Sequence, residues 1–149
     1  MVTIEHTNNP DEGFLALIAR LDAELAAQYG ELQRQYDRHN AVAALQDFVV
    51  AFVDGQPAAC GASKRYDART AEIKRMFVAP EHRRQGLARR VLAELERAAA
   101  DMGYRRAVLE TGVKQEAAIA LYQSVGYRAI GNYGPYAGNA NSVCMGKGL

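Results

Sequence analysis

The stretch AEIKRMFVAPEHRRQGLA, residues 71–88, leads from a strand-like run through a basic turn into a helix. Pro80 prevents the strand from continuing, and Gly86 lies where the turn passes into the helix. Such a turn leaves several backbone N–H groups at the positive end of the helix dipole, an arrangement that binds phosphate in proteins. The first hypothesis is therefore a ligand that carries phosphate.

The helix after Gly86 is predicted to be amphipathic, and Gly103 ends it. Its buried face is predicted from apolar residues at helical spacing, namely Ala88, Val91, Leu92, Leu95, Ala98, Ala99 and Met102. The helix connects a strand at 70–78 to a second strand predicted at 106–111. Because two strands on either side of a crossover helix run in the same direction, this pair should be parallel.

The residues before this stretch predict an antiparallel meander. A strand rich in Phe and Val at 47–53 joins a partner at 56–66 through the two-residue turn Asp54-Gly55. A second short turn then leads into the strand at 70–78. Periodicity and terminal glycines predict the remaining elements: strands at 2–6, 127–130 and 142–146, and helices at 12–30 and 115–125.

The predicted fold is α/β, with one mixed β-sheet of about six to seven strands that helices flank. Its central parallel pair surrounds the crossover helix. The segment from Glu31 to Leu45 shows no clean period and is interpreted as a loop or an irregular short helix. A chain of 149 residues is long enough for one domain with a hydrophobic core, so a single domain is expected over residues 1–149.

Composition limits the classes of partner. The apolar fraction of 49% and the charged fraction of 23% are those of an ordinary globular protein. A net charge of +1 provides no global field toward nucleic acid or an anionic membrane, so neither partner is expected. Residues 1–10 do not resemble a signal peptide, and no apolar run approaches the ~18 residues of a membrane span. A cytoplasmic enzyme or binding domain is the expectation.

Neither the cysteines nor the histidines indicate a metal site. Cys60 and Cys144 lie far apart, without a C-x-x-C motif and without a histidine at ligand spacing. Buried reduced thiols are favoured over a disulfide. The three histidines, at positions 6, 39 and 82, have no partner at a meaningful spacing and are interpreted as surface residues.

The turn could also be only a basic surface loop that caps a helix. Two motifs favour a functional site instead. The run RRQGLA at 83–88 matches the pattern Arg/Gln-x-x-Gly-x-Gly/Ala. The run QEAAIALYQSVGY at 115–127 matches Asn-x-x-Ala-x-x-Leu-Tyr-x-x-x-Gly-Phe/Tyr, with Gln115 in place of Asn. In these motifs the sequence resembles the GNAT superfamily of acetyl-CoA-dependent N-acetyltransferases.

The resemblance implies a site for the cosubstrate acetyl-CoA, with the thioester between two parallel strands that splay apart. The backbone around the turn would bind the pyrophosphate, and the end of the preceding strand would bind the pantetheine arm and the oxyanion. Because Gln115 replaces Asn, a side-chain contact to the pantetheine or to the neighbouring strand is expected to be longer or absent. The cosubstrate-binding residues implied are Met76, Phe77, Val78, Arg83, Arg84, Gln85, Gly86, Leu87, Ala88 and Gln115.

The resemblance also implies two catalytic residues. Glu72 lies at the distance before Gly86 at which histone-acetylating members carry their glutamate base, in an Ala-Glu-Ile strand. Tyr122 occupies the position of the tyrosine that protonates the CoA thiolate in many members. The alternatives are a solvated Glu72 paired with Lys74 or Arg65, and a Tyr122 that only packs on the sheet.

Acceptor specificity is expected to come from two variable segments, Tyr29 to Asn40 and Tyr133 to Tyr136. Arg34 or Lys74 could bind a carboxylate of the acceptor, and Glu31 could bind a cation. Aromatic residues in loops equally often close a core or a dimer interface. The predicted acceptor-binding residues are Glu31, Arg34, Tyr36, Tyr133 and Tyr136.

The function expected is transfer of an acetyl group from acetyl-CoA to a primary amine of a small molecule. Because neither cysteine has a partner histidine, direct transfer in a ternary complex is expected, without an acyl-enzyme and without a metal. A protein-lysine or N-terminal acetyltransferase, and a member that binds acyl-CoA without catalysis, stay open as alternatives. A homodimer is also open.

Overall fold

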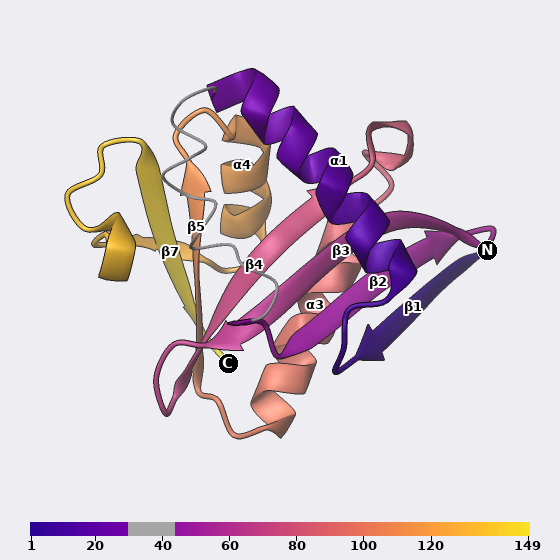
Figure 1. The fold of residues 1–149 in the computed structure, drawn as a ribbon. Coiled ribbons are helices and arrows are strands. Elements are labelled where there is room, and N and C mark those ends of the chain that lie inside the picture. Colours follow the sequence, from indigo (N-terminus) through magenta and orange to yellow (C-terminus); the bar gives the residue numbers. More distant parts are fainter. Residues whose placement is uncertain (30–43) are drawn as a thin grey trace.

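Within the described part of the chain, seven strands form one mixed sheet in the order β1-β2-β3-β4-β5-β7-β6 (Figure 1). The structure is a computed structural model that describes residues 1–29 and 44–149. The strands are β1 Val2–Thr7, β2 Asp47–Val53, β3 Gln56–Arg65, β4 Thr70–Val78, β5 Arg106–Gly112, β6 Arg128–Ile130 and β7 Ser142–Gly148. The helices are α1 Glu12–Tyr29, α3 Leu87–Asp101 and α4 Glu116–Ser124, with 3-10 turns η4 Pro80–His82 and η5 Gly134–Tyr136.

The mixed sheet with a central parallel pair, predicted from the sequence, is confirmed. β1 to β4 are antiparallel neighbours, and β4 pairs with β5 in parallel across the helix α3. The segment from Glu31 to Leu45, interpreted as a loop or an irregular short helix, lies largely outside the described residues, because the structure does not describe 30–43.

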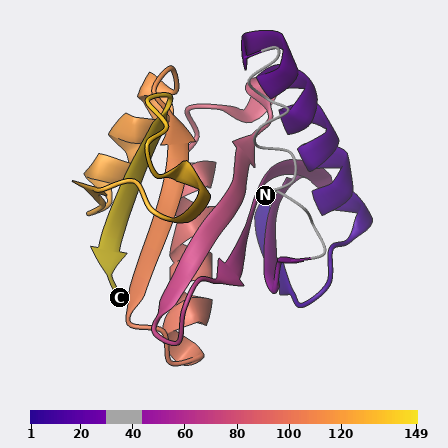
Figure 2. The ribbon, with the colours of Figure 1, turned by 60° about the vertical axis from the view of Figure 1, so that its left-hand side comes forward.

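Two hydrophobic layers hold the sheet between helices. On one face Phe14 and Leu17 of α1 pack on Phe48 of β2 and Phe77 of β4, together with neighbouring apolar residues. On the other face α3 and Tyr122 of α4 pack on residues of β2, β3, β4, β5 and β7. Figures 1 and 2 show α1 across one face of the sheet and α3 behind the other. These two faces are called the α1 face and the α3 face below.

The predicted buried face of α3 is right from Val91 to Ala99, whereas Ala88 at its start is only half-buried. Val91, Leu92 and Leu95 are buried in the core of the α3 face. Met102, however, is 56% exposed, so its prediction as a buried residue is wrong. It is the C-cap residue, one position beyond the last turn, where the helix has passed the part of the sheet that it covers.

The parallel pair separates part of the way along its strands. The pairing of β4 with β5 runs from Thr70↔Arg106 to Ile73↔Leu109 and then stops. β4 nevertheless continues to Val78, and β5 continues to Gly112. Residues 74–78 and 110–112, which do not pair with each other, are called the splayed region below, and Figure 2 shows the two strands diverging there.

A bulge in β4 lies at the start of this splayed region. The β3–β4 register shifts between Cys60 and Ala62, and Arg75 has a φ of 59°. The extra residue resets the alternation, so that Phe77 packs on the α1 face whereas Met76 and Val78 pack on the α3 face. A bulge bends and twists the strand that carries it, which directs β4 away from β5.

The close contact between β3 and α3 depends on Gly61 and gives a stability prediction. A Cβ at position 61 would lie 2.5 Å from Met76 Sδ and 2.8 Å from Leu95 Cδ1. Gly61→Ala should therefore lower the free energy of unfolding by about 1–3 kcal/mol through overpacking, as measured by urea denaturation. Gly131→Ala is the control, since a Cβ there meets no atom of the described residues within 4 Å. Equal stability of the two variants would contradict this account of the contact.

Candidate active site

The splayed edge of β4 provides unpaired backbone groups. Its other edge pairs with β3, as in Cys60↔Phe77 and Ala59↔Val78. Because alternate peptide groups of a strand point to opposite sides, some N–H and C=O groups of 74–78 point toward β5, where no strand of the described sheet pairs with them. These groups can bind an extended ligand arm or an oxyanion, as predicted for Met76, Phe77 and Val78.

The N-terminus of α3 has the geometry of an anion site. Gly86 is its N-cap in the left-handed conformation, with a φ of 77°, and no described side chain caps the first turn. Arg84 also has a positive φ, of 67°. A Cβ at Gly86 would meet no heavy atom of residues 1–29 or 44–149 within 4 Å, so there is space beside the turn. The N–H groups at the start of a helix lack intrahelical partners and favour negative charge, so these residues fit a pyrophosphate.

Within this turn the side chains divide into exposed and buried ones. Arg84 and Gln85 are exposed, whereas Leu87 is buried in the core and offers only its backbone. Arg83 is bound to the protein itself, because its Nη2 donates to both carboxylate oxygens of Glu24 and its Nε donates to the Val78 carbonyl at 2.9 Å. The Arg83 side chain thus links the turn to α1, and its backbone is the part left for a ligand.

Glu72 lies on the α1 face and is only 3% exposed. The Tyr133 hydroxyl donates to Glu72 Oε2 at 2.7 Å, and Lys64 Nζ lies 3.9 Å from Oε1. The alternative of a solvated Glu72 paired with Lys74 or Arg65 is therefore wrong, because the fold buries this carboxylate between β3 and the loop before β7. A carboxylate in this setting can accept a proton from a bound amine.

Tyr133 and Tyr136, predicted to bind the acceptor, both contact the strand that carries Glu72. Burial and the adjacent Glu72 carboxylate raise the pKa of Tyr133. Tyr136 is 2% exposed, and Lys74 Nζ donates to its hydroxyl at 2.8 Å. Both tyrosines thus form the wall around Glu72 and Lys74. Figure 2 shows their segment, in gold, in front of β5.

Tyr122 lies on the α3 face, close to the splayed region. It is 6% exposed and packs edge to face against Tyr127 at 5.8 Å. Burial, followed by the negative charge of Glu110, raises the pKa of Tyr122, so that the hydroxyl keeps its proton at neutral pH. Within residues 1–29 and 44–149 this hydroxyl makes no hydrogen bond. A protonated hydroxyl of this kind is available to a leaving thiolate.

Gln115 is the N-cap of α4, where it makes no side-chain cap. Instead its Nε2 donates to Gln28 Oε1 at 2.7 Å, which links α4 to the end of α1. Three other predicted acceptor residues, Glu31, Arg34 and Tyr36, lie outside the described residues.

Glu110 and Arg75 belong to the surroundings of this site and were missed by the sequence reasoning. Glu110 follows Leu109, the last residue of β5 that pairs with β4, and Ser142 Oγ donates to it at 2.7 Å. Burial raises the pKa of Glu110. Arg75 lies under α1 and pairs with Asp22 at 2.6 Å. The sequence could have indicated Arg75 through the pair Lys74-Arg75, because two charged residues in succession break the alternation of a strand.

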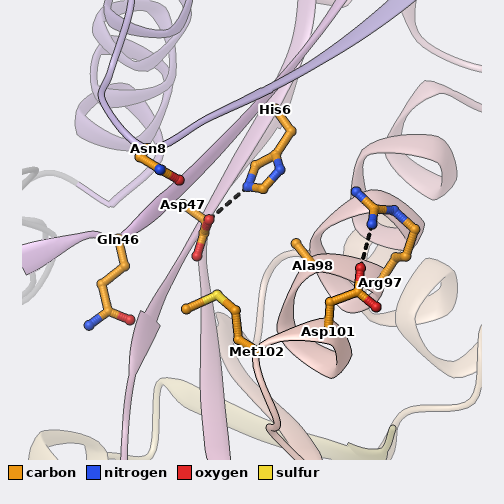
Figure 3. A pocket seen from close by; sticks show the side chains of 8 residues that line it. All are labelled: His6, Asn8, Gln46, Asp47, Arg97, Ala98, Asp101 and Met102. Carbon is orange, nitrogen blue, oxygen red and sulfur yellow. Dashed lines mark hydrogen bonds and ion pairs between the residues drawn. The ribbon is translucent and has the colours of Figure 1, made fainter.

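A pocket of about 510 Å³ lies away from this site, where the end of β1 and the start of β2 approach the C-terminal end of α3 (Figure 3). His6 Nε2 and Asp47 Oδ1, which line it, lie 2.7 Å apart. α3 has its N-terminus beside the splayed region, so this pocket is at the opposite end of that helix. It therefore plays no part in the candidate active site.

Comparisons with known proteins agree with the fold. The acetyltransferase (GNAT) family matches residues 7–127. The IAA acetyltransferase of Azospirillum brasilense is 34% identical over 150 residues, which cover 99% of this chain and 98% of the relative. A solved structure from Klebsiella pneumoniae, of a protein to which acyl-CoA N-acyltransferase activity is ascribed, has a TM-score of 0.82 at 33% identity and covers 100% of this chain and 98% of that chain. The chain belongs to the GNAT family of acetyltransferases.

A more distant structure extends the fold comparison. A GNAT family acetyltransferase of Elizabethkingia anophelis, solved with acetyl-CoA bound, has a TM-score of 0.72 at 21% identity and covers 99% of this chain and 98% of that chain. At this identity the likeness concerns the fold. Within the described residues, no helix has the length and apolar character needed to cross a membrane.

Proposed function

We propose that this protein transfers the acetyl group of acetyl-CoA to a primary amine of a small molecule, directly within a ternary complex. The observation that carries the proposal is the placement of a buried carboxylate and a protonated tyrosine near one splayed strand pair. Glu72 lies on the α1 face, whereas Tyr122 packs on the α3 face. A base and an acid on opposite faces match a reaction in which the amine enters on one side and the thiol leaves on the other.

The proposed binding of acetyl-CoA uses the backbone more than side chains. The first N–H groups of α3, with Gly86 at the cap, would hold the pyrophosphate. The unpaired edge of β4 at Met76 to Val78 would hold the pantetheine arm, and one of its N–H groups would stabilise the oxyanion. The bound acetyl-CoA of the Elizabethkingia structure supports this cosubstrate for the fold.

The chemistry assigned to the side chains follows from their surroundings. An alkyl amine with a pKa near ~10.4 is mostly protonated at neutral pH, so a base is needed before it can attack. Glu72 would accept this proton, directly or through water, while Tyr133 holds the carboxylate in place. Tyr122 would then give its proton to the thiolate.

A glutamine at position 72 tests this role. Glu72→Gln should lower kcat/KM by about 100-fold at neutral pH, in the range typical of a general base, measured as acetyl-CoA-dependent thiol release. The deficit should shrink as the pH rises toward ~10.4, where the amine loses its proton without help. Glu5→Gln, an exposed strand carboxylate on β1, is the control that should keep native rates. A deficit that does not change with pH would remove Glu72 as the base.

The alternatives predict other outcomes in the same assay. The native protein is assayed with a panel of candidate acceptors. These are small primary amines, lysine-containing peptides, peptides with free N-termini, and IAA, the compound in the name of the Azospirillum relative. Release of thiol with small amines supports the proposal. Release with peptides alone favours a protein acetyltransferase. Binding of acetyl-CoA without release for any acceptor would favour a non-catalytic acyl-CoA-binding protein.

A further inference from the structure

Lys74 is a buried cation without an anionic partner among the described residues, at the first unpaired position of the splayed pair. It follows Ile73, just as Glu110 follows Leu109 on β5. The side chain is on the α1 face, since Lys74 pairs with Ala62 of the core on that face. Lys74 is 7% exposed. It therefore lies two residues from Glu72, on the same face of the sheet.

The contacts that the structure describes for Lys74 include no carboxylate. Its Nζ donates to the Tyr136 hydroxyl at 2.8 Å and lies 5.5 Å from the centre of that ring. Within residues 1–29 and 44–149, no carboxylate oxygen lies within 4.0 Å of Nζ. Burial lowers the pKa of Lys74, and the more distant charges of Glu72 and Glu110 oppose this only in part. A buried ammonium group of this kind is stabilised by an anion that binds beside it.

The cosubstrate phosphates are in the wrong place to supply that anion. The proposed phosphate site is at the start of α3, beyond the end of β4 at Val78. At ~3.3 Å per residue, Lys74 lies about 13 Å before Val78 along the strand. The anion that reaches Lys74 should therefore belong to the acceptor, whose amine must come close to Glu72.

We propose that the acceptor is an amino acid, with its amine placed at Glu72 and its carboxylate bound by Lys74. This inference rests on the proposed N-acetyl transfer. Residues two apart on a strand lie about 6.6 Å apart, so one compact molecule with both groups can reach both side chains. Glu72 and Glu110 lie near Lys64 and Lys74. The carboxylates can attract the ammonium group of a zwitterion, and the lysines can attract its carboxylate. A polyamine would bring a second cation close to the two lysines and is disfavoured.

The test compares glycine and each L-amino acid that has a primary amine with its own α-amide, which keeps the shape and the amine but lacks the α-carboxylate charge. Native protein should prefer at least one amino acid over its amide by about 30-fold or more in kcat/KM, the factor expected for losing a buried charged partner. Lys74→Met should abolish this preference, and Lys74→Arg should retain part of it. Calorimetric titration of the same acid and amide, with CoA present, should show the same order of affinities without turnover.

The outcomes separate the two proposals. Turnover of amides as fast as the acids, or a preference that survives in Lys74→Met, overturns the amino-acid inference while the acetyltransferase function stands. No turnover with any amine, acid or peptide overturns the proposed function, and the amino-acid inference with it.

Discussion

Replacing Tyr122 with phenylalanine should lower kcat by about 100-fold or more, while the Kd for acetyl-CoA stays within about threefold of the native value. The reason is that the variant removes one hydroxyl and leaves the ring in its place. Tyr122 keeps its proton because burial and Glu110 raise its pKa, so it is suited to donate to a thiolate. The measurements are thiol release, with an acceptor found in the amine panel, and calorimetric titration of acetyl-CoA.

Tyr127→Phe provides the matched control for this prediction. Tyr127 is the ring that packs against Tyr122, and it is just as deeply buried. Its hydroxyl, however, donates to Glu96 Oε2 at 2.9 Å. The other oxygen of Glu96 forms an ion pair with Lys147. The control should lose about 1 kcal/mol of stability and keep its turnover. A native rate in Tyr122→Phe would show that another group or water protonates the thiolate.

Gly86→Val should raise the Kd for acetyl-CoA by about 100-fold or more, since two charge-assisted hydrogen bonds of about 1.5 kcal/mol each account for that factor. The φ of 77° at Gly86 is strained for any L-residue and most for a β-branched one. The turn must therefore change shape, and its N–H groups no longer converge on a phosphate. Calorimetric titration of acetyl-CoA measures the effect.

Gly103→Val separates this effect from a general loss of stability. Gly103 follows the other end of α3 and has a φ of 96°, and a Cβ there would likewise meet no heavy atom of the described residues within 4 Å. Its valine variant should therefore lose a similar amount of stability and bind acetyl-CoA normally. Affinity retained in Gly86→Val would contradict the role of the turn in phosphate binding.

Much of the fold could be predicted because its signals are local. Gly86 before an amphipathic run marked the start of α3, and Gly126 followed the end of α4, each within a motif of few residues. The parallel direction of β4 and β5 followed from the crossover helix between them. Local signals also placed Glu72 and Tyr122 beside the same pair of strands.

The surroundings of these residues could not be predicted, because they join segments far apart in the chain. Tyr133 reaches Glu72 from 61 positions away, and Gln115 reaches Gln28 from 87 positions away. The sequence pattern could suggest that Tyr133 faces a ligand, yet only the path of the loop before β7 brings its hydroxyl to the carboxylate. Such contacts depend on tertiary packing, which overrides local preference.

The stretch from Ala71 to Ala88 by itself determined a strand, a stop at Pro80, a turn suited to bind an anion and the start of a helix. Tertiary structure decided which side of the sheet each residue of that strand faces. The physical reason is the bulge at Arg75, because one extra residue in a strand exchanges the faces of all residues that follow. Glu72 and Lys74 precede the bulge and share the α1 face by ordinary alternation, whereas the bulge sets the faces of Met76 to Val78 and turns β4 away from β5.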